Sequence, residues 1–216
     1  MQLVYDTDVN VYSFFYSKCF ILFIYFEFLR RKKINIFYLD NNTKECAQMH
    51  VDKHCVKMIL EYAQLLSTAH RVLNGVEYID ASSGRKIKRW KLDTSYDNIL
   101  YKATHINHPS AIWSRQSRDN YAWLWLLLDD LCKEYTYRYS KIHKVEREGL
   151  LEQLRFVPSG IKEHPAFTEP TPAMPPEYIV KGNSIQSYKN YYNGAKQALH
   201  NWKNRPTPDF IEVIQC

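Results

Sequence analysis

The chain has 216 residues, with 29 Lys or Arg, 23 Asp or Glu and a formal net charge of +6. That length allows one domain, or one domain with an appendage, to bury a core without disulfides or structural metal, and the modest basic excess suits a polyanionic partner as well as many ordinary proteins. The five cysteines are odd in number and lack C-x-x-C spacing, which argues against a disulfide framework and indicates free thiols in a reducing, cytoplasmic compartment, the host cytoplasm if the protein is viral.

Residues 1–34 form a leader that differs in composition from the rest of the chain. Residues 11–29 are strongly apolar apart from Lys18 and Glu27, and residues 30–33 (RRKK) follow at once. One interpretation is a membrane anchor with a positive flank, which the two internal charges weaken. No small-residue cleavage site follows, so a secretory signal is not expected. The preferred interpretation is a non-native leader read from AT-rich DNA upstream of the true start, and an ordinary packed helix is the third.

Residues 35–216 predict a mainly α protein, a single compact helical domain with a small hairpin and a long Pro-rich surface loop. Residues 35–40 (NIFYLD) indicate a short strand or an extended lead-in. Asn42 or Thr43 can then cap a long helix from about residue 44 to residue 73.

Six polar residues share one face of this predicted helix, at intervals of four, three, four, three and four: His50, His54, Lys57, Glu61, Gln64 and Thr68. An apolar face lies about 100° round the helix, so this polar stripe borders the core. Two imidazoles, an amine and a carboxylate are the groups from which acid–base, nucleophilic and metal chemistry are built. The alternative is that the six residues are only the solvent-exposed polar side of a surface helix.

Residues 76–92 alternate around a Ser-Ser-Gly turn and predict a basic hairpin, which either follows a phosphate backbone or is a solvated edge protected by Lys. Pro109 suits the first turn of a short helix, and Ser117 can cap a second helix that continues to about residue 143. Two arginines at this junction could bind a phosphate or form a structural ion pair: Arg115 and Arg118.

Six prolines between residues 157 and 178 exclude helix and sheet interior and predict a long surface loop. A final helix, from about Ser184 to Trp202, places aromatic rings along one face with lysines beside them. Such rings can stack on bases while the lysines meet phosphates, and the alternative is that the rings fill the core.

A second hypothesis for the two histidines of the polar stripe is that they bind a metal ion. His50 and His54 at i and i+4 can chelate one ion, but Glu61 lies about 10 Å further along the axis and Lys57 would place an ammonium beside the ion. The remaining ligands would then have to come from other histidines: His70, His105 or His108.

Three segments carry a family resemblance, and their order along the chain gives it most of its weight. In DKHCVKMILEYAQLL, His54 precedes Glu61 by seven residues. EYTYRYSKI follows at residues 134–142, and SYKNYYNGAK at residues 187–196. Together they cover about a third of the chain and resemble the pyrimidine-dimer DNA glycosylases of the phage endonuclease V type, small all-helical repair enzymes of phages, viruses and bacteria.

The resemblance implies an amine and imine mechanism that needs no metal or other cofactor. In the family, the free amine at the chain start attacks C1′ of a damaged nucleotide flipped out of duplex DNA, and β-elimination follows. Here Glu61 would stabilise the sugar intermediate and His54 would orient the substrate. Asn35 would present the amine if translation starts at codon 34, and otherwise Lys57 or Lys53 would be the nucleophile.

The family keeps two arginines near the glutamate, where this chain has Leu60 and Gln64, so the phosphate clamp is expected from other cations: Lys53, Arg115 or Arg118. The resemblance also implies DNA contacts from the tail: Lys189, Tyr191, Tyr192 and Lys196. We therefore expect a DNA glycosylase with abasic-site lyase activity that acts on damaged double-stranded DNA. No obligate protein partner is expected, and a membrane contact is expected only if residues 11–29 are an anchor. The other hypotheses are a metal-dependent helical enzyme using His50 and His54, and a non-enzymatic DNA-binding module.

Overall fold

The computed structural model describes residues 34–93, 95–163 and 166–212, which belong to one unit, Ile34–Cys216. The predicted leader, with the candidate anchor at residues 11–29, lies outside the described residues except for Ile34. No helix in the described part is both long and apolar enough to cross a membrane. Three of the five cysteines are described, and all three are buried free thiols: Cys46, Cys55 and Cys132.

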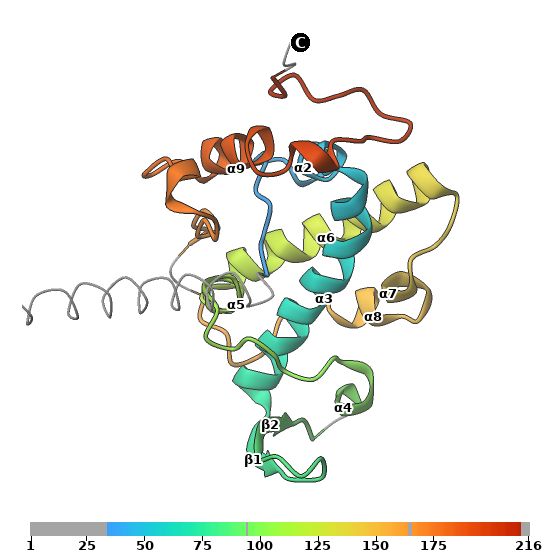
Figure 1. The fold of residues 1–216 in the computed structure, drawn as a ribbon. Helices are drawn as coiled ribbons and strands as arrows, with labels where there is room; N and C mark the ends of the chain where they lie inside the picture. The colour runs from blue at the N-terminus through green and yellow to red at the C-terminus, as the bar shows by residue number, and fades with distance from the viewer. Residues whose placement is uncertain (1–33, 94, 164–165, 213–216) are drawn as a thin grey trace, which may run out of the picture. The chain divides into compact units, whose positions relative to one another are not determined.

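The described part is mainly helical with one two-stranded antiparallel hairpin, as the sequence predicts (Figure 1). The helices are α2 (Thr43–Met49), α3 (Asp52–Asn74), α4 (Tyr96–Ile99), α5 (Pro109–Trp113), α6 (Arg118–Tyr139), α7 (Lys144–Arg147), α8 (Leu150–Gln153) and α9 (Ser184–Asn193), with 3-10 turns η1 (Pro176–Tyr178) and η2 (Gln197–Leu199). The hairpin strands are β1 (Val76–Asp80) and β2 (Ile87–Lys91), paired from Val76 opposite Lys91 to Asp80 opposite Ile87. The sequence pattern did not predict the three shortest helices, α4, α7 and α8.

Helix starts follow the predicted caps. The Asn42 side chain accepts hydrogen bonds from the Lys44 and Glu45 backbone N–H groups at the start of α2. Ser117 accepts one from the Asn120 N–H at the start of α6, and Pro109 occupies the first turn of α5. These local contacts satisfy N–H groups that the first turn of a helix leaves without partners.

The two long helices, α3 and α6, pack against each other, and α2 packs against α6 (Figure 1). Residues 34–40 form an extended lead-in without strand pairing, and Ile36 and Leu39 in it are fully buried. The hairpin lies at the C-terminal end of α3. The lead-in and α3 therefore share the core, which positions the polar side chains of α3 at its edge.

The single helix predicted from residue 44 to residue 73 is wrong, because the chain breaks at His50 and Val51. The Arg138 guanidinium on α6 donates to the carbonyl oxygens of Gln48 and His50, both at 2.8 Å. The Trp202 indole N–H donates to the Met49 carbonyl at 2.9 Å. These donors replace the intrahelical bonds that would continue α2, so His50 does not share a helix with the rest of the polar stripe.

The final helix also ends earlier than predicted, at Asn193 and not at Trp202. Gly194 follows, with its backbone against the Tyr178 ring, and the chain then turns so that the Trp202 side chain reaches the end of α2. Within the Pro-rich segment, residues 157–163 and 166–175 lie outside helices and strands.

Candidate functional site

The Glu61 carboxylate on α3 is divided between two environments. Its Oε1 atom lies 2.8 Å from the Lys57 Nζ atom, one helical turn earlier, whereas its Oε2 atom is buried and has no hydrogen-bond partner among the described residues. The Lys57 side chain is 61% exposed and that of Glu61 is 16% exposed. A buried acceptor without a donor costs about 1–3 kcal/mol of stability. A hydrogen-bond donor or cationic group of a bound molecule would recover this free energy by contacting Oε2.

The next two polar residues of α3 hold a neighbouring segment in place. The Gln64 Nε2 atom donates to the Lys102 carbonyl at 2.7 Å. The Thr68 hydroxyl donates to the Gln64 carbonyl at 2.8 Å and accepts from the Thr104 N–H at 3.3 Å. Gln64 and Thr68 thus anchor the extended segment that leads toward α5, and neither is merely a solvent-exposed polar residue of a surface helix.

His54 is a packing residue in this structure. Its buried ring stacks on Phe37 with 4.1 Å between ring centroids, and its Nδ1 atom lies 2.7 Å from the Tyr192 hydroxyl oxygen. Burial, aided by nearby positive groups, lowers the pKa of His54 to about 2, which keeps the imidazole neutral. No hydrogen bond joins His54 to Glu61 within the described part of the chain, so the predicted substrate-orienting role of His54 gains no support, and the ring instead ties the lead-in to α9.

Both ring nitrogens of His50 are occupied by protein groups. Its Nδ1 atom lies 2.7 Å from the Cys46 carbonyl oxygen and its Nε2 atom 3.3 Å from the Tyr62 hydroxyl. Because a carbonyl can only accept, Nδ1 carries the proton and Nε2 accepts from Tyr62, whose oxygen in turn accepts the Phe37 N–H at 3.0 Å. His50 therefore has no free lone pair for a metal, and no group of three His, Cys, Asp or Glu among residues 34–212, with gaps at 94 and 164–165, is arranged to hold one.

Asn35, the residue predicted to present the amine, is 3% exposed, and both polar atoms of its side-chain amide form hydrogen bonds. The Nδ2 atom donates to the Ala173 carbonyl at 2.9 Å, and the Oδ1 atom accepts from the Tyr188 hydroxyl at 3.0 Å. In this chain the backbone nitrogen of Asn35 forms a peptide bond with Ile34 and is not an amine.

The three candidates for a phosphate clamp differ in accessibility. The Arg115 guanidinium donates to the carbonyls of Ala111 and Ile106 at 2.5 and 2.6 Å, and partial burial lowers its pKa, so it acts as a structural clamp between loop and helix. Arg118 forms a 3.5 Å ion pair with Glu163 in which both side chains are largely exposed. Lys53 is exposed and makes no ion pair within the described part. Lys53 and Arg118 can therefore bind an external phosphate, whereas the Arg115 guanidinium already binds two backbone carbonyls.

The tail residues predicted to contact DNA divide in the same way. Tyr191 and Tyr192 are 6% and 0% exposed and pack around Phe37, so their ring faces are not open to bases and the core-filling alternative holds for them. The Lys196 ammonium lies over the Tyr191 ring at 4.7 Å from its centroid, and Lys189 lies over Phe210 at 5.3 Å. Both lysines are half-buried.

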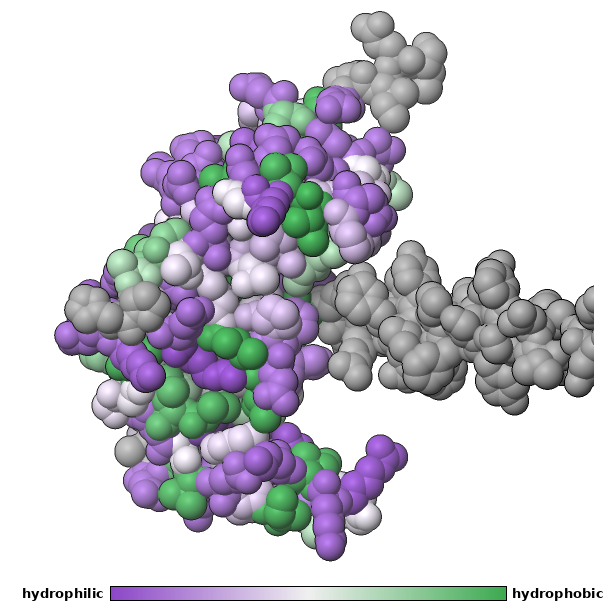
Figure 2. Space-filling model, turned by 90° about the vertical axis from the view of Figure 1, so that its left-hand side faces the viewer, coloured by the Kyte–Doolittle hydropathy of each residue, from purple (hydrophilic) through white to green (hydrophobic). Residues whose placement is uncertain are grey.

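The hairpin projects at the lower end of the face in Figure 2, where hydrophilic and hydrophobic side chains lie together. Lys88 pairs with Glu77 at 2.8 Å across the two strands and also lies over the Trp90 ring. The outer strand β1 exposes apolar side chains as well, such as Val76 and Ile79. A cross-strand ion pair of this kind is typical of a solvated edge and leaves the phosphate-contact hypothesis without a specific observation.

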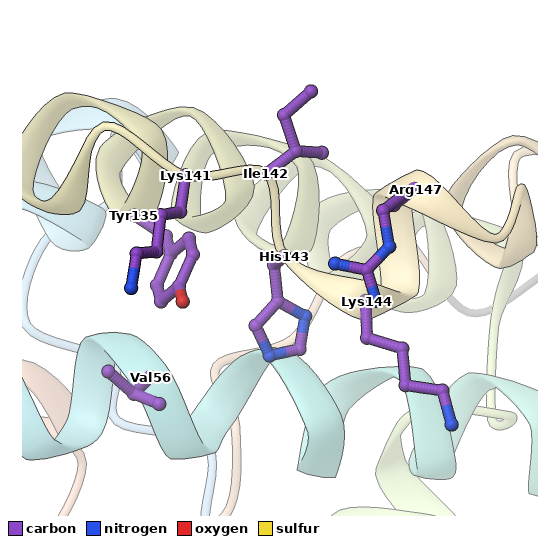
Figure 3. A pocket seen from close by; sticks show the side chains of 7 residues that line it. All are labelled: Val56, Tyr135, Lys141, Ile142, His143, Lys144 and Arg147. Atoms are coloured by element: carbon purple, nitrogen blue, oxygen red, sulfur yellow. The ribbon is translucent and has the colours of Figure 1, made fainter.

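Sequence reasoning missed a pocket between α3 and the turn that joins α6 to α7 (Figure 3). Its volume is about 560 Å³, and it is lined by Val56, Tyr135, Lys141, Ile142, His143, Lys144 and Arg147. The signal that could have found it is the three-residue spacing of cations in KIHKVER, residues 141–147. Three of its seven lining residues are Lys or Arg, and we call it the basic pocket.

No family model, curated protein or solved structure matches the chain.

Proposed function

We propose that this protein is a DNA glycosylase with abasic-site lyase activity that works through an amine and the Glu61 carboxylate. The observation that carries the proposal is the Glu61 carboxylate, with one oxygen bound to the Lys57 amine at 2.8 Å and the other buried without a partner. An amine beside a carboxylate supplies a nucleophile and the base that frees it. The resemblance of the DKHCVKMILEYAQLL, EYTYRYSKI and SYKNYYNGAK segments to pyrimidine-dimer glycosylases supports the choice of damaged DNA as substrate.

The first step follows from the Lys57 and Glu61 geometry. The Lys57 ammonium passes a proton to Glu61 Oε1, and the free amine attacks C1′ of the damaged nucleotide. The nitrogen–C1′ bond forms as the C1′–base bond breaks, and the base leaves with the bonding pair and takes the proton from Glu61. As the proton passes from Glu61 to the leaving base, the carboxylate regains its charge, and its unpartnered Oε2 atom then stabilises the positive charge at the sugar.

The second step cleaves the strand. The nitrogen lone pair opens the sugar ring to give an imine, and the ring oxygen takes the proton that the nitrogen loses. The regenerated Glu61 carboxylate then removes a proton from C2′, and the 3′ phosphate leaves with the electron pair of the C3′–oxygen bond. Water hydrolyses the imine and restores the amine. If the amine instead belongs to a chain that begins at Asn35, Glu61 keeps the same roles.

Borohydride trapping on dimer-containing and abasic duplexes tests the proposal. The full chain should form a covalent adduct that persists in a chelator, since no step uses a metal. Lys57→Arg should lose the adduct because a guanidinium does not form the imine, and Lys53→Arg, four residues earlier on the same helix, is the matched control that should keep it. Glu61→Gln should slow strand cleavage by about 10²–10⁴-fold, the usual contribution of a general acid–base group.

Peptide mapping of the adduct identifies the attacking amine. If Lys57→Arg keeps the adduct, the attacking amine is not Lys57. A form of the protein that begins at Asn35 then tests the terminal amine. Absence of an adduct from both the full chain and the Asn35 form contradicts the proposal. If duplex binding remains in that case, the protein is the non-enzymatic DNA-binding module, which the exposed Lys53 and Arg118 would also suit.

A further inference from the structure

The basic pocket combines cations from one short turn with an apolar floor from α3. Figure 3 shows the Lys141 side chain beside the Tyr135 ring on one side of His143 and the Arg147 guanidinium on its other side, all above Val56 of α3. Ile142 points away from this space. None of the seven lining residues is acidic.

The cations of the pocket are only weakly neutralised by the protein. Lys144 forms a 3.6 Å pair with Glu148, and both of these side chains are more than half exposed, at 61% and 54%. Lys141 and Arg147 form no ion pair with any residue that the structure describes. Exposed pairs contribute at most about 1 kcal/mol, so an incoming anion competes easily for Lys144 as well.

His143 adds a neutral hydrogen-bond donor to these charges. Its Nδ1 atom accepts the Val145 N–H at 3.2 Å and therefore carries no proton. The proton of the neutral ring is then on Nε2, and Figure 3 shows the ring directed toward α3. Cations on either side of an N–H donor can each bind one oxygen of a phosphate group, while the N–H group binds another.

The floor of the pocket and Glu61 belong to the same helix, α3. At about 100° per residue, Lys53, Lys57 and Glu61 lie roughly 60°, 100° and 140° round α3 from Val56, the floor of the pocket. On a helix about 10–12 Å in diameter with a rise of about 1.5 Å per residue, the surface path from Val56 to Glu61 is roughly 15 Å. A duplex strand rises about 3.4 Å per phosphate, so about four or five consecutive phosphates cover this distance.

We propose that the basic pocket binds a backbone phosphate of the double-stranded DNA on which Glu61 and Lys57 act. The choice of DNA as the partner rests on the proposed function, while the anion-binding character rests on the pocket itself. A bound phosphate there orients the strand across α3 and directs a nucleotide a few positions along the strand toward Glu61. The pocket supplies the clamp that Leu60 and Gln64 do not provide.

Salt-dependent binding of the full chain to an undamaged duplex tests the pocket independently of catalysis. The test variant is the double substitution Lys141→Gln with Arg147→Gln. The matched control, Lys44→Gln with Arg155→Gln, removes the same two charges from exposed positions outside the pocket. Each lost phosphate contact should weaken binding about eightfold at 0.1 M salt and reduce the slope of log K against log salt by about 0.9.

The proposal predicts that the pocket variant binds at least eightfold more weakly with a shallower slope, while the control stays within twofold of the wild type. Equal weakening of both variants, or no change in the pocket variant, overturns it. So does an effect confined to single-stranded RNA of the same length, which would make RNA the partner. Weakened duplex binding in the pocket variant, together with no borohydride adduct from either the full chain or the Asn35 form, would uphold the pocket and reject the glycosylase, so the two failures are distinguishable.

Discussion

Replacing Arg138 by Met should cost about 3–5 kcal/mol of the free energy of unfolding, because it removes one partner from a buried charge network. The Arg138 side chain is fully buried, and it donates to Glu134 Oε1 at 2.7 Å and to Asp52 Oδ1 at 2.9 Å. It also donates to the Gln48 and His50 carbonyls, both at 2.8 Å. Methionine fills a similar volume but leaves these acceptors with fewer donors, at about 1–3 kcal/mol for each buried group that is left unpaired.

Urea denaturation measures this loss as a lower midpoint, with an unchanged slope if the denatured state stays the same. Glu134 keeps its contact with Arg205 at 2.8 Å, which limits the loss to the range given. Arg155→Met is the control, because its pair with Glu152 has both side chains 63% exposed and should contribute less than about 1 kcal/mol. A loss for Arg138→Met no larger than that of the control would refute the reasoning.

Two further predictions concern stability. Burial lowers the pKa of three histidines from 6.5, to about 4 for His50 and His70 and about 2 for His54. Since the unfolded chain protonates these rings below about pH 6.5 while the folded chain keeps them neutral, their contribution is complete above that pH and falls by about 1.4 kcal/mol per pH unit and per ring on acidification toward the folded pKa values. Urea denaturation at pH 7 and pH 5 measures the change, and equal or greater stability at pH 5 would contradict it. Gly194→Ala should lower stability by about 1–3 kcal/mol, since the added Cβ atom would overlap the Tyr178 ring, and an unchanged melting temperature would show that the ring moves aside freely.

Local signals in the sequence predicted several elements well. Asn42, Ser117 and Pro109 mark helix starts because each acts on backbone groups within three residues of itself. The alternating pattern of residues 76–92 predicted the hairpin, since period-two alternation suits an exposed pair of strands. The periodicity of residues 52–74 predicted most of α3, including the side of the helix that meets the core.

The candidate site was predictable in part. The interval between Lys57 and Glu61 is one helical turn, so the sequence alone brings the amine and the carboxylate together. The sequence could not show that Glu61 Oε2 is buried without a partner, or that His54 is occupied by Phe37 and Tyr192. Tyr192 is 138 residues away from His54 along the chain, and no spacing rule covers such a distance.

The sequence by itself determined the helical class, the hairpin, the caps and the pairing of Lys57 with Glu61, because these depend on contacts within one or two turns. The tertiary structure alone decided where the first predicted helix breaks and which polar residues stay accessible. Arg138, from the distant helix α6, takes the carbonyls at the end of α2 and separates His50 from the polar stripe. The basic pocket likewise exists because the turn after α6 folds back over Val56 of α3. Long-range donors and packing, which no local pattern encodes, thus set the polar surface around Glu61.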